Sequence, residues 1–195
     1  MREIIAECES AGHSHGLAAG LALALAGVDA DAAPGPFAAL PASEVPAGTP
    51  VLAHPMAAKE GISFVRTRRR KDVPAELRTG IAVRLGAARL GTTQRLYERA
   101  VEHLSARTSG GEPTVRKQLV QGVLADTHVG LEVARRGLRI AANAALTDLH
   151  DRLTALDWEL AKLLGASGYA GEHAVAGAFV SRLAANCWLP RDGAA

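Results

Sequence analysis

Apolar residues recur at intervals of three or four positions along much of the second half of the chain, and this spacing places side chains on one face of an α-helix. The first such run contains Leu77, Ile81, Leu85, Ala88, Leu96, Ala100 and Leu104. Asp72 can cap a helix, and Pro74 suits a first helical turn. The pattern therefore predicts one long amphipathic helix, which ends at the Gly- and Pro-containing cluster 108–113.

Two further helical patterns and a short last helix follow this cluster. The second pattern contains Val115, Leu119, Val123, Leu131, Ala134 and Leu138. The third contains Leu146, Leu149, Leu153, Leu156, Leu160 and Leu163. It stops at the turn 165–168, and the last helix is expected over about residues 172–188. Four helices joined by short turns pack most simply as an antiparallel four-helix bundle, so the expected fold class is all-α.

The first 71 residues are patterned differently. Residues 2–27 predict a helix with an Ala/Leu face, whose apolar run 17–27 is too short to cross a bilayer and follows acidic rather than basic residues. Six prolines between residues 33 and 55 exclude a continuous helix and favour irregular structure or short strands. We therefore expect an N-terminal helix (1–32), a connecting segment (33–71) and a helical bundle domain (72–195), without a membrane span.

Composition and charge narrow the classes of partner. Aromatic residues make up only 4% of the chain and there are 20 glycines, so the core has to use small side chains at close backbone approach. The formal net charge of +2 gives no reason to expect nucleic acid as the partner. The run 66–71 contains five basic residues, which suits either a solvated hinge or a dock for an acidic partner or phosphate.

The cysteines and histidines of the first half suggest no metal site. Cys8 and Cys187 lie near opposite ends of the chain and form no disulfide framework, so a reducing cytoplasm is the simplest location. His13 and His15 would point about 200° apart on a helix. Because no further ligand lies close to them and to Cys8 in sequence, we expect no bound metal.

The two turns of the expected bundle carry motifs. The first turn and the helix after it contain Arg107, Gly110, Gly111, Pro113, Gln118 and Leu124-Ala125-Asp126. The second turn reads Gly165-Ala166-Ser167-Gly168-Tyr169 and is followed by Glu172. In order and spacing, these residues resemble the C-terminal helical domain of the flavin-dependent acyl-CoA dehydrogenases, over about residues 72–182.

Departures from the family pattern bear on function. The first turn of the family has a phenylalanine where this chain has Gly110. The glutamate that serves as the family's base aligns near Leu189 or, in some members, at Ile81, so neither position offers a carboxylate. The resemblance implies a shortened, degenerate member that is not a complete acyl-CoA dehydrogenase by itself. We expect its isolated chain to bind no flavin tightly.

Arg107 and Gln118 are the candidate cofactor-binding residues. By the resemblance, they would hold the diphosphate and adenine side of an FAD molecule that belongs to a neighbouring subunit. An arginine beside two glycines also suits any phosphate, since the bare turn exposes backbone N–H groups. The alternative is that Arg107 only closes a helix C-terminus and that Gln118 only forms a hydrogen bond where the next helix begins.

Glu172 and His173 are the candidate catalytic residues. They follow the glycine-containing turn 165–171, and a histidine beside a carboxylate can act as a general base near neutral pH. The alternative is a helix start whose acidic residue complements the helix dipole.

Three functions remain open at this point. The first is a subunit of a heteromeric acyl-CoA dehydrogenase-like complex in bacterial specialised metabolism, which abstracts a proton, with elimination or ring closure, from a free or carrier-bound intermediate without using flavin. The second is a non-catalytic partner that completes or stabilises a flavin-dependent chain. The third is a small regulator that binds nucleic acid through residues 66–71. For the first two we expect a related subunit or a second copy of this chain as partner.

Overall fold

The computed structural model of the chain describes residues 2–68, 72–140, 143–170 and 174–189. Its helices are α1 (Arg2–His15), α2 (Leu17–Ala24), α3 (Pro55–Lys59), α4 (Ala75–Ala106), α5 (Gln118–Ile140), α6 (Asn143–Ala170) and α7 (Ala174–Trp188). The strands of one sheet are β1 (Phe37–Pro41), β2 (Val51–Leu52) and β3 (Ile62–Arg66), and a hairpin consists of β4 (Thr108–Ser109) and β5 (Glu112–Pro113). The chain is mostly helical as predicted, and the connecting segment 33–71 forms short strands, one of the two alternatives that its prolines left open.

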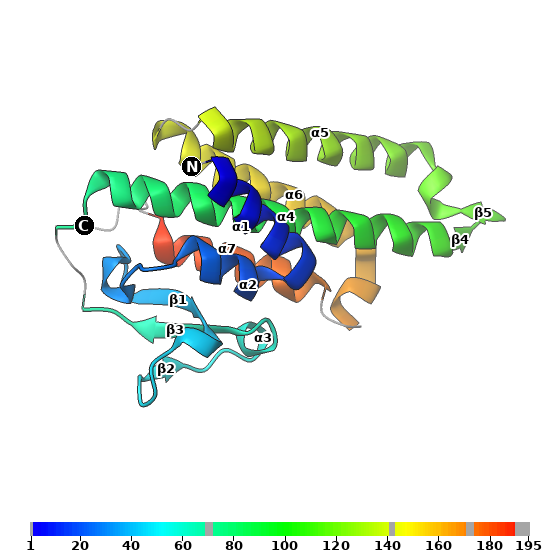
Figure 1. Ribbon diagram of the computed structural model, residues 1–195. Coiled ribbons are helices and arrows are strands. Elements are labelled where there is room, and N and C mark those ends of the chain that lie inside the picture. The colour runs from blue at the N-terminus through cyan, green and yellow to red at the C-terminus, as the bar shows by residue number, and fades with distance from the viewer. Residues whose placement is uncertain (1, 69–71, 141–142, 171–173, 190–195) are drawn as a thin grey trace.

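Helices α4 to α7 form the expected bundle. They run alternately in opposite directions, and the long α4 lies at the centre of the molecule (Figure 1). Ala88, Leu131 and Leu153 come from three of these helices and are buried in one core, as their helical spacing predicts. Helix α4 begins at Ala75 with Pro74 at its N-cap position, so the predicted cap at Asp72 is wrong.

Helices α1 and α4 approach closely because glycines line their contact. A Cβ atom on Gly91 would lie 2.0 Å from the backbone oxygen of Glu9, and one on Gly12 would lie 2.2 Å from that of Ala88. Larger residues at these positions would force the helices apart. The expectation of a core built on small residues is confirmed here.

Residues 2–27 do not form the single helix that the apolar pattern predicts. Gly16 has a φ of 90° and separates α1 from α2, which ends at Ala24. Residues with a side chain rarely adopt this conformation, so glycine makes the break possible. The break directs α2 toward the sheet, where Leu17 and Leu21 are buried with residues of β1 and β3.

The sheet is joined to the bundle through α7. Strand β3 is central and antiparallel to both neighbours, with Phe37 of β1 opposite Arg66 and Pro41 opposite Ile62. The indole Nε1 of Trp188 donates a hydrogen bond of 2.8 Å to the backbone oxygen of Ala39. This contact links the end of the last helix to the first strand.

Two details of α5 and α6 differ from the sequence pattern. Leu119 is 87% exposed, whereas Leu124 is buried, so the apolar stripe that packs inward begins later in α5 than predicted. Gly165 has a φ of 55° and a ψ of −144°, and it interrupts α6 without ending it. The predicted turn at 165 is therefore a kink within a helix that continues to Ala170.

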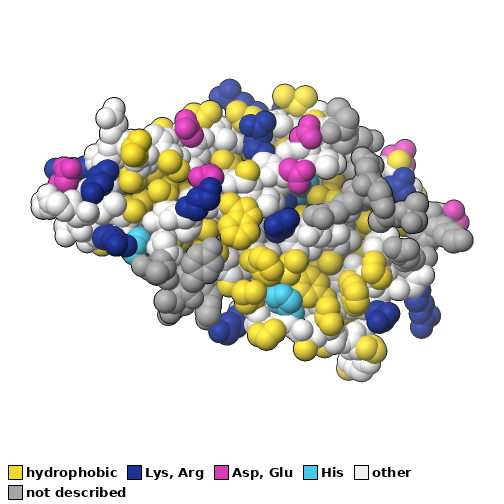
Figure 2. Space-filling view, turned by 180° about the vertical axis from the view of Figure 1, so that it is seen from behind, with side chains coloured by type: hydrophobic (Ala, Val, Ile, Leu, Met, Phe, Trp, Pro, Cys, Tyr) yellow, Lys and Arg dark blue, Asp and Glu magenta, His cyan; other side chains and the backbone are white. Residues whose placement is uncertain are grey.

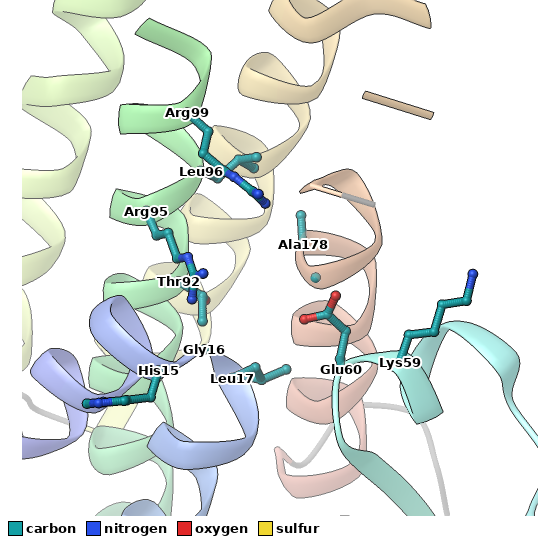
Figure 3. A pocket seen from close by; sticks show the side chains of 11 residues that line it. His15, Gly16, Leu17, Lys59, Glu60, Thr92, Arg95, Leu96, Arg99 and Ala178 are labelled. Atoms are coloured by element: carbon teal, nitrogen blue, oxygen red, sulfur yellow. The ribbon is translucent and has the colours of Figure 1, made fainter. Parts of the chain in front are cut away.

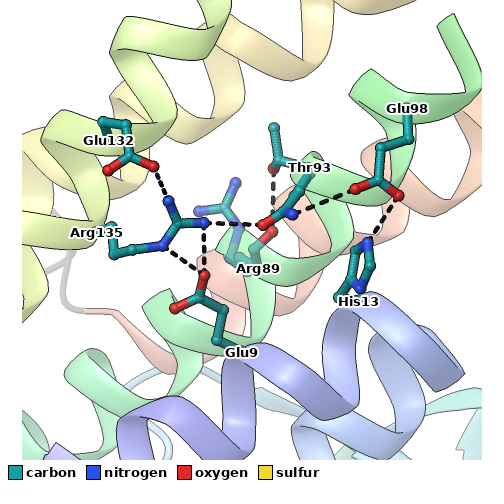
Figure 4. A network of polar contacts seen from close by, with 8 residues as sticks. Glu9, His13, Arg89, Thr93, Glu98, Glu132 and Arg135 are labelled. Carbon is teal, nitrogen blue, oxygen red and sulfur yellow. Dashed lines mark hydrogen bonds and ion pairs between the residues drawn. The ribbon is translucent and has the colours of Figure 1, made fainter. Parts of the chain in front are cut away.

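A polar cluster connects α1, α4 and α5. Nε of Arg135 donates to Oε1 of Glu9 at 2.7 Å, Nη2 donates to Oε1 of Gln94 at 2.8 Å, and the same guanidinium pairs with Glu132 (Figure 4). His13 Nε2 lies 2.8 Å from Oε2 of Glu98 beside this cluster. His13 thus has a structural role between two helices.

Candidate functional site

A cavity of about 230 Å³ lies where the bundle meets the segment that leads into β3. Its walls come from the α1–α2 break, the end of α3, α4 and α7. Arg95 and Arg99 extend from α4 toward α7, and Glu60 faces α7 from the α3 side (Figure 3). In the same view Lys59 and the His15 ring point away. The charged groups directed inward are therefore two guanidinium groups and one carboxylate.

The two arginines form a pair because they are four residues apart on one helix. Thr92, about one turn before Arg95, donates its hydroxyl to the backbone oxygen of Arg89 at 2.7 Å and is thereby oriented by its own helix. Arg95 and Arg99 are both exposed at the cavity. Two guanidinium groups at this spacing suit a phosphate or carboxylate, which they can hold with charge-assisted hydrogen bonds.

Glycines shape the cavity on two sides. A Cβ atom on Gly177 would lie 3.1 Å from Oε2 of Glu60, so the carboxylate rests against the backbone of α7. A Cβ atom on Gly16 would lie 3.7 Å from a terminal nitrogen of Arg95. The backbone at Gly16 therefore lies next to the Arg95 side chain, and the backbone of α7 at Gly177 lies next to the Glu60 carboxylate.

Helix α4 also carries a completely buried arginine. Arg89 donates from Nε to Oγ of Ser181 at 2.9 Å, from Nη2 to Oγ1 of Thr154 at 2.8 Å and from Nη1 to the backbone oxygen of His150 at 3.1 Å. Nη1 also lies 2.9 Å from His150 Nδ1, which must accept, so His150 is neutral and its Nε2–H donates to the backbone oxygen of Ala82. These contacts hold α4, α6 and α7 together.

Burial shifts the titration of the groups around Arg89. It raises the pKa of Asp157 to about 7, although the Arg89 charge and a hydrogen bond with Thr93 act in the opposite direction. It lowers the pKa of His150 to about 3, together with the Arg89 charge. The space beside Asp157 measures only about 10 Å³, so it has no room for a substrate. The Arg89 cluster is therefore structural.

The predicted cofactor residues lie at a different place from the cavity. Arg107 follows the last turn of α4, its backbone N–H donates to the oxygen of His103 at 3.1 Å, and its own oxygen accepts from Thr114 N–H at 2.7 Å. Gln118 begins α5. Both side chains are exposed at the base of the β4–β5 hairpin, which projects from the end of the bundle (Figure 1). The structure brings these two residues to one turn, but neither lines the cavity.

The candidate catalytic residues Glu172 and His173 lie outside the described residues. Ile81, Leu189 and Arg66, the other positions singled out in the sequence, are described. Ile81 is 2% exposed in the core and Leu189 packs against it, so neither position holds a base. The guanidinium of Arg66 lies 5.5 Å from the centre of the Phe37 ring, so the described start of the basic run is held against the sheet.

In the part of the chain that the structure describes, no group of three or more His, Cys, Asp and Glu side chains could hold a metal ion. Cys8 is buried, and burial raises the pKa of its thiol to about 11. None of the helices in this part of the chain is long and apolar enough to cross a membrane.

Sequence reasoning missed Glu60, Arg95 and Arg99. Arginines four residues apart on a polar helix face are typical of solvated surfaces, and this pair gave no other signal. Glu60 is 35 residues before Arg95 and approaches α4 only through the packing of α3 against α7. No spacing along the chain could have connected the three.

A family model for the C-terminal domain of acyl-CoA dehydrogenases matches residues 81–188, which is more than half of the chain. The chain therefore belongs to the acyl-CoA dehydrogenase family, as its two turns predicted. No curated protein matches the sequence.

Solved structures show the same fold at low sequence identity. FkbI, described as serving biosynthesis of the methoxymalonyl extender unit of the polyketide immunosuppressant Fk520, is 21% identical with a TM-score of 0.52, over 70% of this chain and 47% of its own. Butyryl-CoA dehydrogenase from Megasphaera elsdenii is 17% identical with a TM-score of 0.52, over 76% of this chain and 45% of its own. The chain thus spans about half the length of these proteins.

The family is associated with FAD, and the residues present fit only part of that cofactor. Arg107 and the turn at Gly110 and Gly111, with φ values of 69° and 87°, present a cation and bare backbone that suit a phosphate. An aromatic ring is missing from the turn because Gly110 replaces it.

Proposed function

We propose that this chain is a subunit of an acyl-CoA dehydrogenase-like complex in bacterial specialised metabolism, and that it takes an acyl thioester of CoA or of a carrier protein into the cavity. The observation that carries the proposal is the cavity itself, where Arg95 and Arg99 face a space that Glu60 also borders. The arginines bind the phosphate of the thioester carrier, and Glu60 acts on the acyl part. The family membership supports a thioester as the substrate class.

The proposed chemistry is proton abstraction without flavin. The Glu60 carboxylate takes a proton from the carbon next to the thioester carbonyl, and the electron pair of that C–H bond moves toward the carbonyl oxygen to form an enolate. If the next carbon carries a leaving group, the pair then forms a C=C bond and the group departs with its own electrons. This sequence needs no oxidant, which agrees with a chain that keeps only part of the flavin motif.

Deuterium exchange tests the proton transfer. The purified chain, alone and with any subunit that co-purifies, is incubated with butyryl-CoA in deuterated buffer, and label at the α-carbon is measured by mass spectrometry. Glu60→Gln should lower the exchange rate by about two orders of magnitude, the usual worth of a general base. Glu44→Gln, the same change at an exposed carboxylate that does not line the cavity, should have no effect. Equal rates for the wild type and Glu60→Gln overturn the role of Glu60.

A second candidate function is that of a non-catalytic partner, and an exposed apolar surface favours it. Hydrophobic side chains gather over the lower half of the molecule seen from behind, where the sheet lies (Figure 2). Val51 and Leu52 of β2 are each 53% exposed and Met56 of α3 is 38% exposed, and the His54 ring between them in sequence contacts Phe64 and Phe179. Such a surface suits a catalytic chain that covers it.

The two functions differ in one measurement. Turnover of the co-purified catalytic chain is compared with and without this chain, and again with Glu60→Gln. A requirement for this chain that Glu60→Gln leaves intact supports the non-catalytic partner. Loss of turnover with Glu60→Gln supports the catalytic subunit.

A further inference from the structure

A second cavity, of about 530 Å³, lies between the beginnings of α1 and α4 and the end of α5. These three helix ends lie toward the left of the molecule in Figure 1. Pockets that enclose small molecules measure about 300–1,000 Å³, so the second cavity is large enough for one. It shares no lining residue with the cavity of the candidate site, and Thr79 and Arg95, one from each, are about 24 Å apart along α4.

Buried apolar side chains from all three helices line the second cavity. Ile5 of α1, Val83 of α4 and Leu138 of α5 are 6%, 5% and 2% exposed. Gly80 also lines it, and a Cβ atom on this residue would meet nothing within 4 Å, so the space extends to the backbone of α4. The inner part of the second cavity therefore suits the apolar body of a ligand.

The charged residues of the second cavity are Arg2, Arg139 and Glu76, and all three are exposed. Among the described residues, none of these side chains has a hydrogen-bond or ion-pair partner. Arg135, one turn earlier on α5, is by contrast paired with Glu9. Two guanidinium groups beside one carboxylate leave a single positive charge, which a monoanion neutralises.

We propose that the second cavity binds an amphipathic carboxylate, a molecule with an apolar chain and one anionic head group. The chain packs against Ile5, Val83 and Leu138, and the carboxylate lies between Arg2 and Arg139. A guanidinium binds the two oxygens of a carboxylate with paired, charge-assisted hydrogen bonds. A phosphate dianion would carry a surplus negative charge next to the Glu76 side chain, so the lining favours the carboxylate.

This binding site is separate from the proposed thioester site. Deuterium exchange into butyryl-CoA reports on Glu60, which does not line the second cavity. Binding of a free carboxylate reports on the second cavity alone, so either proposal can fail while the other holds.

Titration calorimetry of the full chain with octanoate, below its micelle-forming concentration, tests the head-group contacts. Arg2→Gln and Arg139→Gln should each weaken octanoate binding by about tenfold, since each removes charge-assisted hydrogen bonds. Arg136→Gln makes the same change at an exposed arginine of α5 that does not line the second cavity, and it should bind octanoate like the wild type.

The chain and the charge are tested separately. Acetate has the head group without the chain, and octylamine has the chain with a positive head group, so both should bind at least tenfold more weakly than octanoate. Gly80→Leu should weaken octanoate binding by tenfold or more, because its side chain occupies the space that glycine leaves open. Helical circular dichroism of each variant controls for folding.

Three results overturn the proposal. The first is a wild type that binds no octanoate up to millimolar concentration. The second is octylamine binding as tight as octanoate binding, because the arginines would then not select the head group. The third is octanoate binding that Arg95→Gln weakens and Arg139→Gln does not, which would place the ligand in the other cavity.

Discussion

Helix α4 carries arginines of two kinds. Arg89 is completely buried, and all three of its nitrogens have partners on α6 or α7. Arg95 and Arg99, two to three turns later, are exposed and extend into the cavity (Figure 3). The same residue type on one helix thus serves two purposes.

The difference lies in what surrounds each guanidinium. Around Arg89, two hydroxyls, a neutral imidazole and a backbone oxygen accept hydrogen bonds from all three guanidinium nitrogens, and Asp157 supplies the nearby acidic group, so the guanidinium is held by α6 and α7 in the interior. At the cavity, bare backbone at Gly16 and Gly177 leaves space that the arginines border. A buried guanidinium that donates to neighbouring helices indicates a structural role, and exposed guanidinium groups beside a cavity indicate binding.

Replacing Arg89 with methionine should have the largest effect on the protein. The change keeps the length of the side chain but removes the donors to Ser181, Thr154 and His150. Loss of one member of a buried charged group costs about 3–5 kcal/mol of unfolding free energy. Urea unfolding followed by circular dichroism measures this loss. Arg95→Met, the same change on the same helix, should stay within about 0.5 kcal/mol of the wild type. Equal losses for both variants would contradict the division between them.

Replacing the two cavity arginines should affect binding instead of stability. Arg95→Ala and Arg99→Ala should each weaken the affinity for CoA by about tenfold, since a hydrogen bond to a charged group contributes about 1.5 kcal/mol. Titration calorimetry with CoA gives the affinities. Arg107→Ala, at the hairpin, is the matched control and should bind CoA like the wild type. If Arg107→Ala weakens binding and the cavity variants do not, the phosphate site is at the hairpin.

The sequence predicted the helices well because their stability comes from apolar periodicity, as for Leu146, Leu153 and Leu160 in α6. It also predicted the family from the residues of two turns. It could not separate Arg89 from Arg95, because burial of a charged side chain depends on partners such as Ser181 that are distant in the chain.

The break at Gly16 was not predicted, because a single glycine leaves the spacing of the neighbouring apolar residues unchanged. Predicting Glu60 as a site residue would have required knowledge of how α3 packs against α7, which no local pattern contains. The hairpin motif was correctly recognised, yet its two residues lie away from the cavity.

The pH dependence of stability should reveal the buried cluster. The pKa of Asp157 is raised from 3.8 to about 7, so the folded state binds more protons there, and this group makes stability fall as pH rises from about 4 to about 7. The pKa of His150 is lowered from 6.5 to about 3, so the folded state binds fewer protons there, and stability falls as pH drops below about 6.5. The two effects oppose each other between about pH 4 and 6.5.

Asp157→Asn should remove the first effect and leave the second. The variant should therefore lose more stability than the wild type when pH is lowered from about 6.5 to about 4. Urea unfolding at a series of pH values measures both profiles. Parallel profiles for Asp157→Asn and the wild type would show that Asp157 is not linked to folding in this range.

The smallest expected effect comes from Gly177→Ala, which should slow deuterium exchange at the cavity without lowering the stability of the protein. Gly177→Ala places a Cβ atom 3.1 Å from Oε2 of Glu60, so the carboxylate has to move by a few tenths of an ångström. Proton transfer depends steeply on such distances, and we expect a few-fold slower deuterium exchange into butyryl-CoA.

The stability of Gly177→Ala should not fall, because alanine is favoured over glycine inside a helix by up to about 1 kcal/mol. Gly80→Ala in α4, whose Cβ atom would meet nothing within 4 Å, should gain similar stability with unchanged exchange. If Gly177→Ala exchanges at the wild-type rate, the position of Glu60 against α7 does not limit the reaction, and the base must be sought on another wall of the cavity.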